Sequence, residues 1–303
     1  MSRAHRATPL LSRGDAIGVA GPGFALRKAK LEAGIAEIER MGYRPLRGKH
    51  LLASHGYLAG TDDQRGEDLR FLLAHPEVRA VWFARGGYGT ARVLDRVPWS
   101  ALRRHPKLLI GYSDLTALFN AAVQRAGLIA LYGPVVTELG QPATYHPGSL
   151  RKLLAGESLE LRVSRRQILA PGRATGTLLG GNLSVLTHLC GTRFMPDLRG
   201  SILFIEETGE QTYRIDRTLT QLRMAGALKG VAGVVIGAML VPARKRFPAD
   251  RPLLSMLREE LLPLGVPVVS GLPAGHCANK RTLPLGGRAE IDAASGRVRF
   301  SLP

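Results

Sequence analysis

Three polar residues of this chain each follow a short apolar segment, and their types are those of a nucleophilic catalytic site. They are Ser113, Glu206 and His276. A serine hydroxyl needs a base to take its proton, and an imidazole base needs a carboxylate to fix its tautomer and stabilise the imidazolium. The set therefore suits serine-dependent hydrolysis. The order Ser, acid, His is one of several that can fill these roles, so the order alone does not decide the matter. A lone histidine after a glycine is more often a loop or core residue.

Ser113 lies where an apolar strand changes abruptly into a helix, in the sequence LLIGYSDLTAL of residues 108–118. A sharp strand-to-helix turn pushes the serine hydroxyl out of the sheet and beside helix N-terminal amides, which can stabilise the oxyanion formed by its attack. The alternative is that Ser113 only caps the helix that follows.

Two other groups of reactive side chains are weaker candidates. Glu206 and Glu207 adjoin, so we expect one to face the site and the other to face solvent. Paired carboxylates can hold a metal, but no His-x-x-x-His or Cys-x-x-Cys spacing accompanies them, and we expect no metal. Cys277 adjoins His276, but neighbours on an extended backbone point different ways. We therefore expect Cys190 and Cys277 to be inert packing residues.

A glycine-rich segment, Arg85–Gly89 (RGGYG), could form a phosphate cradle or bring a backbone amide to a reacting carbonyl, and a simple tight turn is the alternative. It lacks the Lys-Ser/Thr of a P-loop, and Gly18–Gly23 does not fit Gly-x-Gly-x-x-Gly. We therefore expect no nucleotide cofactor.

Composition indicates a globular chain long enough for two domains, with 303 residues and 45% hydrophobic residues. The net charge is +18, but the 34 Arg and 8 Lys are scattered without interleaved aromatic residues, which argues against specific nucleic-acid binding. No run of 18 apolar residues occurs, and the apolar stretch near the N-terminus is too short for a secretory signal. We expect a cytoplasmic protein that does not bind membranes, and two cysteines fit that compartment.

The first half of the chain alternates strand and helix patterns, which predicts βαβ units around a mostly parallel sheet. Ligands bind beyond the carboxyl ends of such strands, where Gly21, Gly86 and Ser113 would lie. The expected strands are residues 15–20, 78–84, 108–112 and 128–132, and the expected helices are 28–41, 62–74, 90–96 and 114–126.

The second half reads as α+β with a curled sheet. Residues 158–163 and 172–179 look like antiparallel strands around a Pro-Gly turn, and residues 241–252 like a charged loop whose role in gating is open. We predict an N-terminal domain of residues 1–155, a linker of 156–175 and a C-terminal domain of 176–303. Further strands are expected at 201–205, 231–236, 266–270, 289–292 and 297–301, with helices at 180–189 and 213–225.

Several separate motifs occur in order along residues 14 to 292. They are Ala84–Gly89, Gly111–Thr116, Gly180–Ser184, Ile202–Glu207, Tyr213–Arg217, Gly275–His276 and Leu283–Gly286. Together they resemble the LD-carboxypeptidases, also called muramoyl-tetrapeptide carboxypeptidases. That family includes the peptidases that confer immunity to microcin C.

The resemblance implies a serine peptidase with an N-terminal α/β nucleophile domain and a C-terminal domain built on a barrel-like sheet. On the matching positions, the nucleophile is Ser113, the general base His276 and the orienting carboxylate Glu206. The oxyanion donors are the N–H of Asp114 and an amide within Gly86–Gly87. The family usually forms homodimers and needs no metal or other cofactor.

The activity implied is removal of the terminal D-alanine from cytoplasmic murein tetrapeptide, a small peptide substrate, during cell-wall recycling. A microcin-type activity on peptidyl- or aminoacyl-nucleotides is the alternative, and a nucleic-acid-binding protein is a more distant one. The chain departs from the family pattern at Glu207, where Asp is more usual, and at Lys280, where Asn is more usual.

Overall fold

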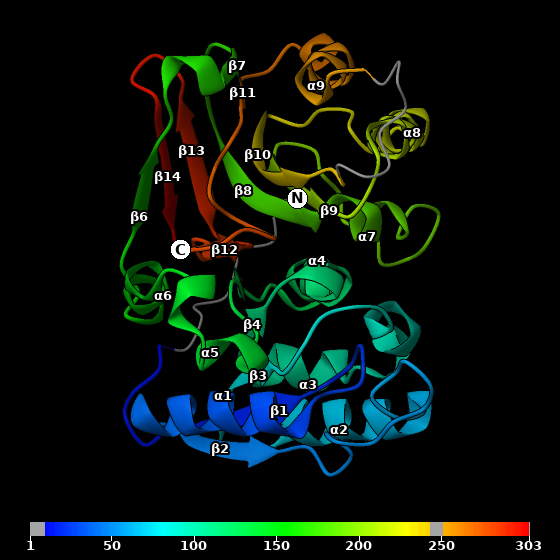
Figure 1. Ribbon diagram of the computed structural model, residues 1–303, viewed down its shortest axis with the longest axis vertical. Coiled ribbons are helices and arrows are strands. Elements are labelled where there is room, and N and C mark those ends of the chain that lie inside the picture. The colour runs from blue at the N-terminus through cyan, green and yellow to red at the C-terminus, as the bar shows by residue number, and fades with distance from the viewer. Residues whose placement is uncertain (1–9, 243–250, 303) are drawn as a thin grey trace.

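The computed structural model describes residues 10–242 and 251–302, which form two α/β domains, each built on its own sheet (Figure 1). In this part of the chain the first sheet has six strands in the order β12-β5-β4-β3-β1-β2. All its pairings are parallel except β12 with β5. The first sheet is therefore the mostly parallel sheet that the strand–helix alternation predicts.

Apart from β12, which lies where the two domains meet, the elements of the first domain lie in the lower half of Figure 1. Its strands are β1 (Ala16–Ala20), β2 (Arg44–Arg47), β3 (Val78–Phe83), β4 (Leu108–Gly111), β5 (Ala130–Tyr132) and β12 (Leu283–Leu285). Its helices are α1 (Lys28–Arg40), α2 (Asp62–Ala74), α3 (Trp99–Arg104), α4 (Thr116–Ala126), α5 (Val136–Leu139) and α6 (Pro147–Leu154).

The second sheet has eight strands within the described residues, in the order β6-β14-β13-β8-β9-β10-β11-β7, and it curls above the first domain in Figure 1. Its first four strands pair antiparallel, and β8 to β11 pair parallel. The strands are β6 (Leu159–Arg162), β7 (Ile168–Ala170), β8 (Arg173–Asn182), β9 (Ile202–Thr208), β10 (Gly233–Leu240), β11 (Val268–Val269), β13 (Arg288–Asp292) and β14 (Arg297–Ser301). The helices are α7 (Leu183–Thr187), α8 (Thr212–Met224) and α9 (Leu253–Leu261).

Helix α4 joins the two sheets. Nine of its eleven residues are buried, because it packs on the first sheet and also reaches β8. The Asn120 side chain exchanges two hydrogen bonds with the Gly180 backbone, at 2.8 and 2.9 Å, and Asn182 N–H donates to Thr116 Oγ1 at 2.9 Å. Buried polar groups must be paired, so these bonds fix the start of α4 against the second sheet.

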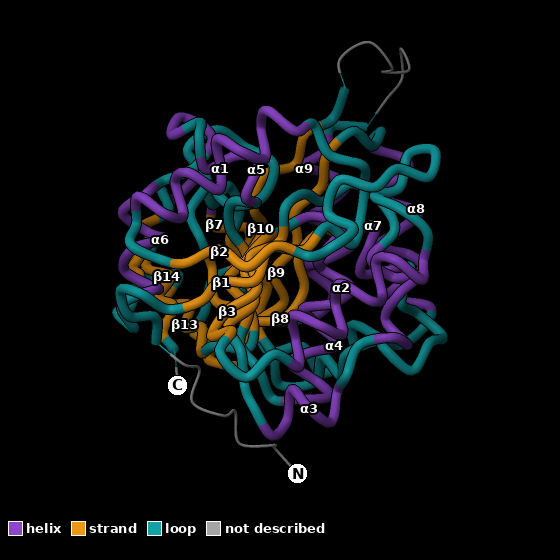
Figure 2. The backbone as a smooth tube through the Cα atoms, turned by 90° about the horizontal axis from the view of Figure 1, so that it is seen from below, coloured by secondary structure: helices purple, strands orange, loops and turns teal. Residues whose placement is uncertain are grey.

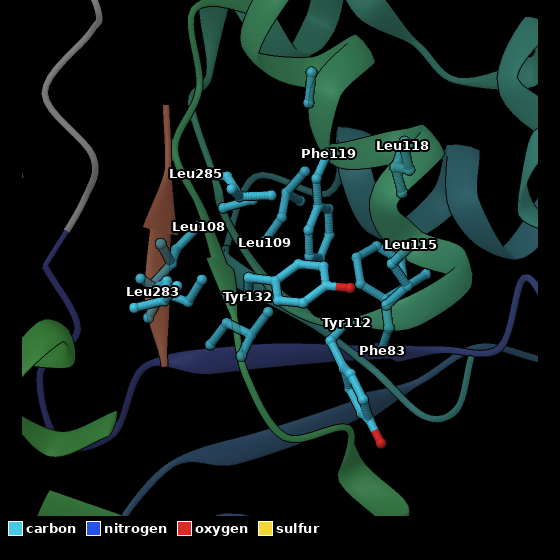
Figure 3. Close-up of a cluster of buried hydrophobic side chains, with 14 of the residues drawn as sticks. Phe83, Leu108, Leu109, Tyr112, Leu115, Leu118, Phe119, Tyr132, Leu283 and Leu285 are labelled. Carbon is cyan, nitrogen blue, oxygen red and sulfur yellow. The ribbon is translucent and has the colours of Figure 1, made fainter. Parts of the chain in front are cut away.

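The apolar core behind β4 and β5 is continuous across the two domains, because the same cluster includes Phe204 of β9 and Phe300 of β14. Figure 3 shows Leu283 and Leu285 of β12 beside Leu108 and Leu109 of β4, with the ring of Tyr132 in the same cluster. In the view from below, the strands of both sheets gather at the centre with helices around them (Figure 2). None of the helices among the described residues is long and apolar enough to cross a membrane.

The predicted fold class is confirmed, and several local expectations are wrong. Strands 158–163 and 172–179 do not pair with each other: β6 pairs with β14, and β8 pairs with β13 and β9. Residues 180–182 end β8 instead of opening a helix. Strands β2, β7 and β12 and helices α3, α5, α6 and α9 were not predicted from the sequence. Most of the predicted loop at 241–252 lies outside the described residues, and the domain boundaries stay a prediction.

Candidate active site

The turn after β4 holds Ser113 in a backbone conformation that non-glycine residues rarely adopt. Its φ is 70°, and Asn279 is the other non-glycine residue with positive φ in the described chain. Such strain costs of order 1–3 kcal/mol and persists where the surroundings fix it. The N-cap of α4 is Leu115, so the capping role considered for Ser113 does not apply. The turn therefore has the geometry of a nucleophile elbow.

The loop after β3 packs directly against this turn. A Cβ added to Gly86 would lie 2.9 Å from Ser113 Cβ and 3.2 Å from its Oγ, so only glycine permits the approach. The Gly86 carbonyl accepts the Phe24 N–H at 3.1 Å. Because the C=O and N–H of one trans peptide point in opposite directions, the Gly87 N–H points away from Phe24 and is free to face a ligand.

Glu206 and His276, seventy residues apart, form a close pair. Glu206 Oε2 lies 2.8 Å from His276 Nδ1 and also accepts the His276 backbone N–H at 3.1 Å. A Cβ on Gly275 would lie 2.5 Å from the same Oε2, and its φ is +92°, so this position needs glycine. A carboxylate on Nδ1 selects the tautomer with the proton there, which leaves Nε2 free to act as a base.

Tyr132, at the end of β5, connects this pair to Ser113. Its hydroxyl donates to Glu206 Oε1 at 2.8 Å and accepts the Ser113 N–H at 3.1 Å. Burial raises the pKa of Tyr132 well above its usual value, so the hydroxyl keeps its proton. The Ser113 N–H is thus occupied, which leaves the amides of Asp114 and Gly87 as the candidate oxyanion donors.

Tyr112 supports the His276 ring from the other side of the elbow. Its ring centroid lies 4.8 Å from that of His276, and in Figure 3 its side chain extends away from the apolar cluster. Its hydroxyl donates to Glu138 Oε1 at 2.8 Å, and Lys280 Nζ donates to the same oxygen at 2.9 Å. Lys280, which stands where the family pattern more often has Asn, is thus a buried cation that fastens the loop carrying His276 to the first domain.

The hydrogen bonds of the described residues do not include one between Ser113 and His276, although Tyr112 brings the elbow and the imidazole together. Such bonds often tighten only when substrate binds. Within the described residues, no three His, Cys, Asp or Glu side chains gather closely enough to hold a metal ion.

Comparison with known proteins gives the family. Residues 17–133 match the LD-carboxypeptidase N-terminal domain, and residues 175–291 match the LD-carboxypeptidase C-terminal domain. A probable murein peptide carboxypeptidase of Bacillus subtilis is 37% identical over 94% of this chain and 91% of its own. The chain belongs to the LD-carboxypeptidase family. It is a serine-type peptidase, as the motifs implied.

Two further similarities bear on its function. A murein tetrapeptide carboxypeptidase of Pseudomonas aeruginosa is 34% identical, over 94% of each chain. The structure of the microcin immunity protein MccF in complex with glutamyl sulfamoyl guanosine superposes with a TM-score of 0.86, covering 98% of each chain at 24% identity. The second similarity shows the shared fold alone.

The side chain of Asp114 has a structural role, although its backbone N–H is a candidate oxyanion donor. The carboxylate is buried and accepts the N–H and the hydroxyl of Thr90 at 2.8 and 2.6 Å. Burial raises the pKa of Asp114. The side chain therefore ties the loop after β3 to the elbow.

The expectation that one of the adjacent glutamates faces solvent is wrong, because β9 continues through both residues to Thr208 and is covered on both faces. Glu207 is 3% exposed. It accepts bonds from Asn182 Nδ2 at 2.9 Å and from the Ser184 N–H and hydroxyl at 2.8 and 2.7 Å. Glu207 therefore fastens the start of α7 to β9.

Sequence reasoning missed Tyr112, Tyr132 and Glu138, because these act through contacts with residues remote in the chain. Tyr132 is the last residue of an apolar strand, and Ser113 closely follows another; this was the one available signal. Both cysteines are free and partly buried, and burial raises the pKa of the Cys190 and Cys277 thiols, which disfavours the reactive thiolate.

Proposed function

We propose that this protein is a cytoplasmic serine carboxypeptidase that removes the terminal D-alanine from murein tetrapeptide during cell-wall recycling. The observation that carries the proposal is the placement of Glu206. One of its oxygens bonds to His276 and the other bonds through the Tyr132 hydroxyl to the backbone of Ser113. The similarity to the Pseudomonas aeruginosa murein tetrapeptide carboxypeptidase supports the substrate.

The proposed reaction begins when His276 Nε2 takes the Ser113 hydroxyl proton and Oγ attacks the carbonyl of the L,D peptide bond. The N–H groups of Asp114 and Gly87 stabilise the oxyanion, an effect of about 3 kcal/mol for one such donor. Protonated His276 then gives its proton to the leaving D-alanine nitrogen. Water, deprotonated by His276, cleaves the acyl-enzyme, releases the tripeptide and restores Ser113.

The test is incubation of the protein with L-Ala-γ-D-Glu-diaminopimelyl-D-Ala and with the same peptide ending in L-Ala, followed by assay of free alanine. We expect release from the D-terminated peptide and little from the other. Equal release from both would contradict the proposed L,D specificity, and no release from either would refute the proposed substrate.

The alternative, cleavage of aminoacyl- or peptidyl-nucleotides, has one structural feature in its favour. Phe24, Tyr57 and Tyr88 form an aromatic cluster beside Gly87, and Tyr57 is 60% exposed, so a nucleobase could stack there. The ligand in the MccF complex carries a guanosine. Comparing kcat/KM for glutamyl sulfamoyl guanosine and the tetrapeptide distinguishes the two functions: a higher value for the nucleotide would favour the alternative.

We also propose that the protein forms a homodimer, as the family pattern implies, and that it has no specific nucleic-acid partner, because its basic residues are scattered along the chain. Sedimentation analysis should give about twice the chain mass of 32.7 kDa. Affinity for added DNA or RNA that falls steeply with salt would instead indicate that the positive charge serves nucleic-acid binding.

A further inference from the structure

A cavity of about 470 Å³ opens at the carboxyl edge of the first sheet, between the N-terminal end of α1, the loop after β3 and helix α5. Ligands of parallel sheets bind at this edge. We call it the cationic pocket, and its charged and polar lining includes Arg27, Lys30, Arg85, Thr137, Glu138 and Gln141.

The charges in the cationic pocket do not balance. Arg27, Lys30 and Arg85 form no salt bridge with any residue in 10–242 or 251–302. Glu138 is the acidic residue of the lining, and its Oε1 already accepts Lys280 Nζ and the Tyr112 hydroxyl. The pocket therefore presents cations without a counter-charge, and guanidinium groups bind carboxylates in a defined geometry.

The structure also orients Arg85. Its Nη1 donates to the Ala25 carbonyl at 2.7 Å, and its guanidinium lies over the Phe24 ring with Cζ 5.6 Å from the centroid. A side chain held at two points loses less entropy when it binds a ligand. The remaining guanidinium N–H groups are available to a ligand in the pocket.

Two walls of the cationic pocket are next to residues that contact the elbow. Arg85 directly precedes Gly86, which packs against Ser113. Glu138 is bonded to Tyr112, which directly precedes Ser113. The cationic pocket and the elbow are thus connected through residues that are adjacent in the chain.

We propose that the cationic pocket binds the free terminal carboxylate of the substrate, with Arg85 as its principal partner, and this rests on the proposed carboxypeptidase function. When the last peptide bond is cut, that carboxylate lies one residue, at most about 3.6 Å, from the reacting carbonyl. When the oxygen of the reacting carbonyl is bound by the Gly87 N–H, Arg85 is the cationic residue nearest to that N–H in the sequence. A peptide that continues past this bond brings a neutral amide to the pocket, so the pocket selects terminal residues.

The test compares kcat/KM for the tetrapeptide and for its C-terminal amide in the wild type and in Arg85→Gln. The control Arg104→Gln removes the same charge from an exposed side chain on α3, near the opposite edge of the sheet. We expect Arg85→Gln to lower kcat/KM about 10- to 100-fold for the acid and less than about threefold for the amide. Arg104→Gln should change neither.

Arg85 also holds the loop at Ala25, so its replacement could disturb the fold of that loop. The double variant Arg27→Gln/Lys30→Gln, at two exposed residues, provides a second probe. It too should reduce the difference in kcat/KM between the tetrapeptide and its C-terminal amide. The proposal would be overturned if Arg85→Gln lowered kcat/KM equally for both substrates, or if it left kcat/KM for the tetrapeptide acid unchanged.

Binding separates this proposal from the proposed reaction. Calorimetric titration of Ser113→Ala with N-acetyl-D-alanine and with its amide needs no turnover. Binding of the acid alone, lost in Arg85→Gln, would support the pocket even if the wild type failed to cleave the tetrapeptide. Equal binding of acid and amide would overturn it even if cleavage occurred.

Discussion

The two domains position their parts of the site in different ways. In the first domain, the location of Ser113 follows from local backbone geometry: a strand that ends at Gly111, a φ of 70° and a glycine loop packed on the turn. In the second domain, the locations of Glu206 and His276 follow from hydrogen bonds between segments seventy residues apart. The first arrangement can be read from a short sequence, and the second only from the folded chain.

Tyr132 is where these two arrangements meet, because its hydroxyl contacts the elbow and the carboxylate together. We infer that the elbow and the acid–base pair are aligned by this residue and by the Lys280–Glu138 ion pair. Substitutions in the acid–base pair, in the elbow and in the residues that align them should therefore change kcat by different amounts.

The largest effect is expected for the acid–base pair. His276→Ala removes the proposed base and should lower kcat for D-alanine release by about 10⁶-fold, whereas Glu206→Gln should cost about 10⁴-fold. The adjacent Cys277→Ala is the control and should stay within about threefold of the wild type. Activity of His276→Ala within tenfold of the wild type would mean that another group acts as base.

A smaller effect is expected for a change in the elbow's packing. Gly86→Ala puts a Cβ 2.9 Å from Ser113 Cβ and should lower kcat about 100-fold by displacing Ser113, the proposed nucleophile. The control Gly21→Ala, at the same edge of the sheet, would meet its nearest neighbour at 3.5 Å, an ordinary contact. Steady-state kinetics with a thermal-denaturation check measure both, and an equal loss in the two variants would argue against a specific role for Gly86.

Tyr132→Phe should lower kcat about tenfold with little change in KM, because Ser113 N–H and Glu206 Oε1 each lose a buried partner. Tyr112→Phe removes a hydroxyl that bonds to Glu138 and keeps the ring against His276, so it should cost less than about threefold. If the two variants had the same kcat, the alignment role of Tyr132 would be refuted.

The smallest effect on catalysis is expected for Glu207→Gln. This change weakens the bonds to Asn182 and Ser184 and should lower the free energy of unfolding by about 1–3 kcal/mol, while kcat stays within about threefold. Urea denaturation measures the first quantity and the alanine assay the second. A large loss of kcat in a stable Glu207→Gln variant would contradict the assignment of Glu206 to the reaction and of Glu207 to the structure alone.

The sequence was sufficient for the fold class and the elbow because both depend on local patterns. Alternating apolar segments and helical faces predict the parallel first sheet, and the abrupt change at Ser113 predicts the turn. Strand β12 could not be predicted from such local patterns. It has only three residues, with Pro284 in the middle, and it pairs with β5 at the edge of the sheet, where a proline is tolerated.

The side-chain network of the site required the structure. The apolar pattern of Ile202–Ile205 predicts a strand, but only the pairing of β9 with β8 and β10 shows that the strand continues and buries both glutamates. Lys280 was noticed as a departure, and its partner Glu138, 142 residues earlier, could not be found from spacing.

The measurement that tests the central claim most directly is mass spectrometry of L-Ala-γ-D-Glu-diaminopimelyl-D-Ala after incubation with the wild type and with Ser113→Ala. We predict loss of one alanine residue from the peptide with the wild type and none with Ser113→Ala. Loss of alanine with both proteins would contradict the assignment of Ser113 as the nucleophile.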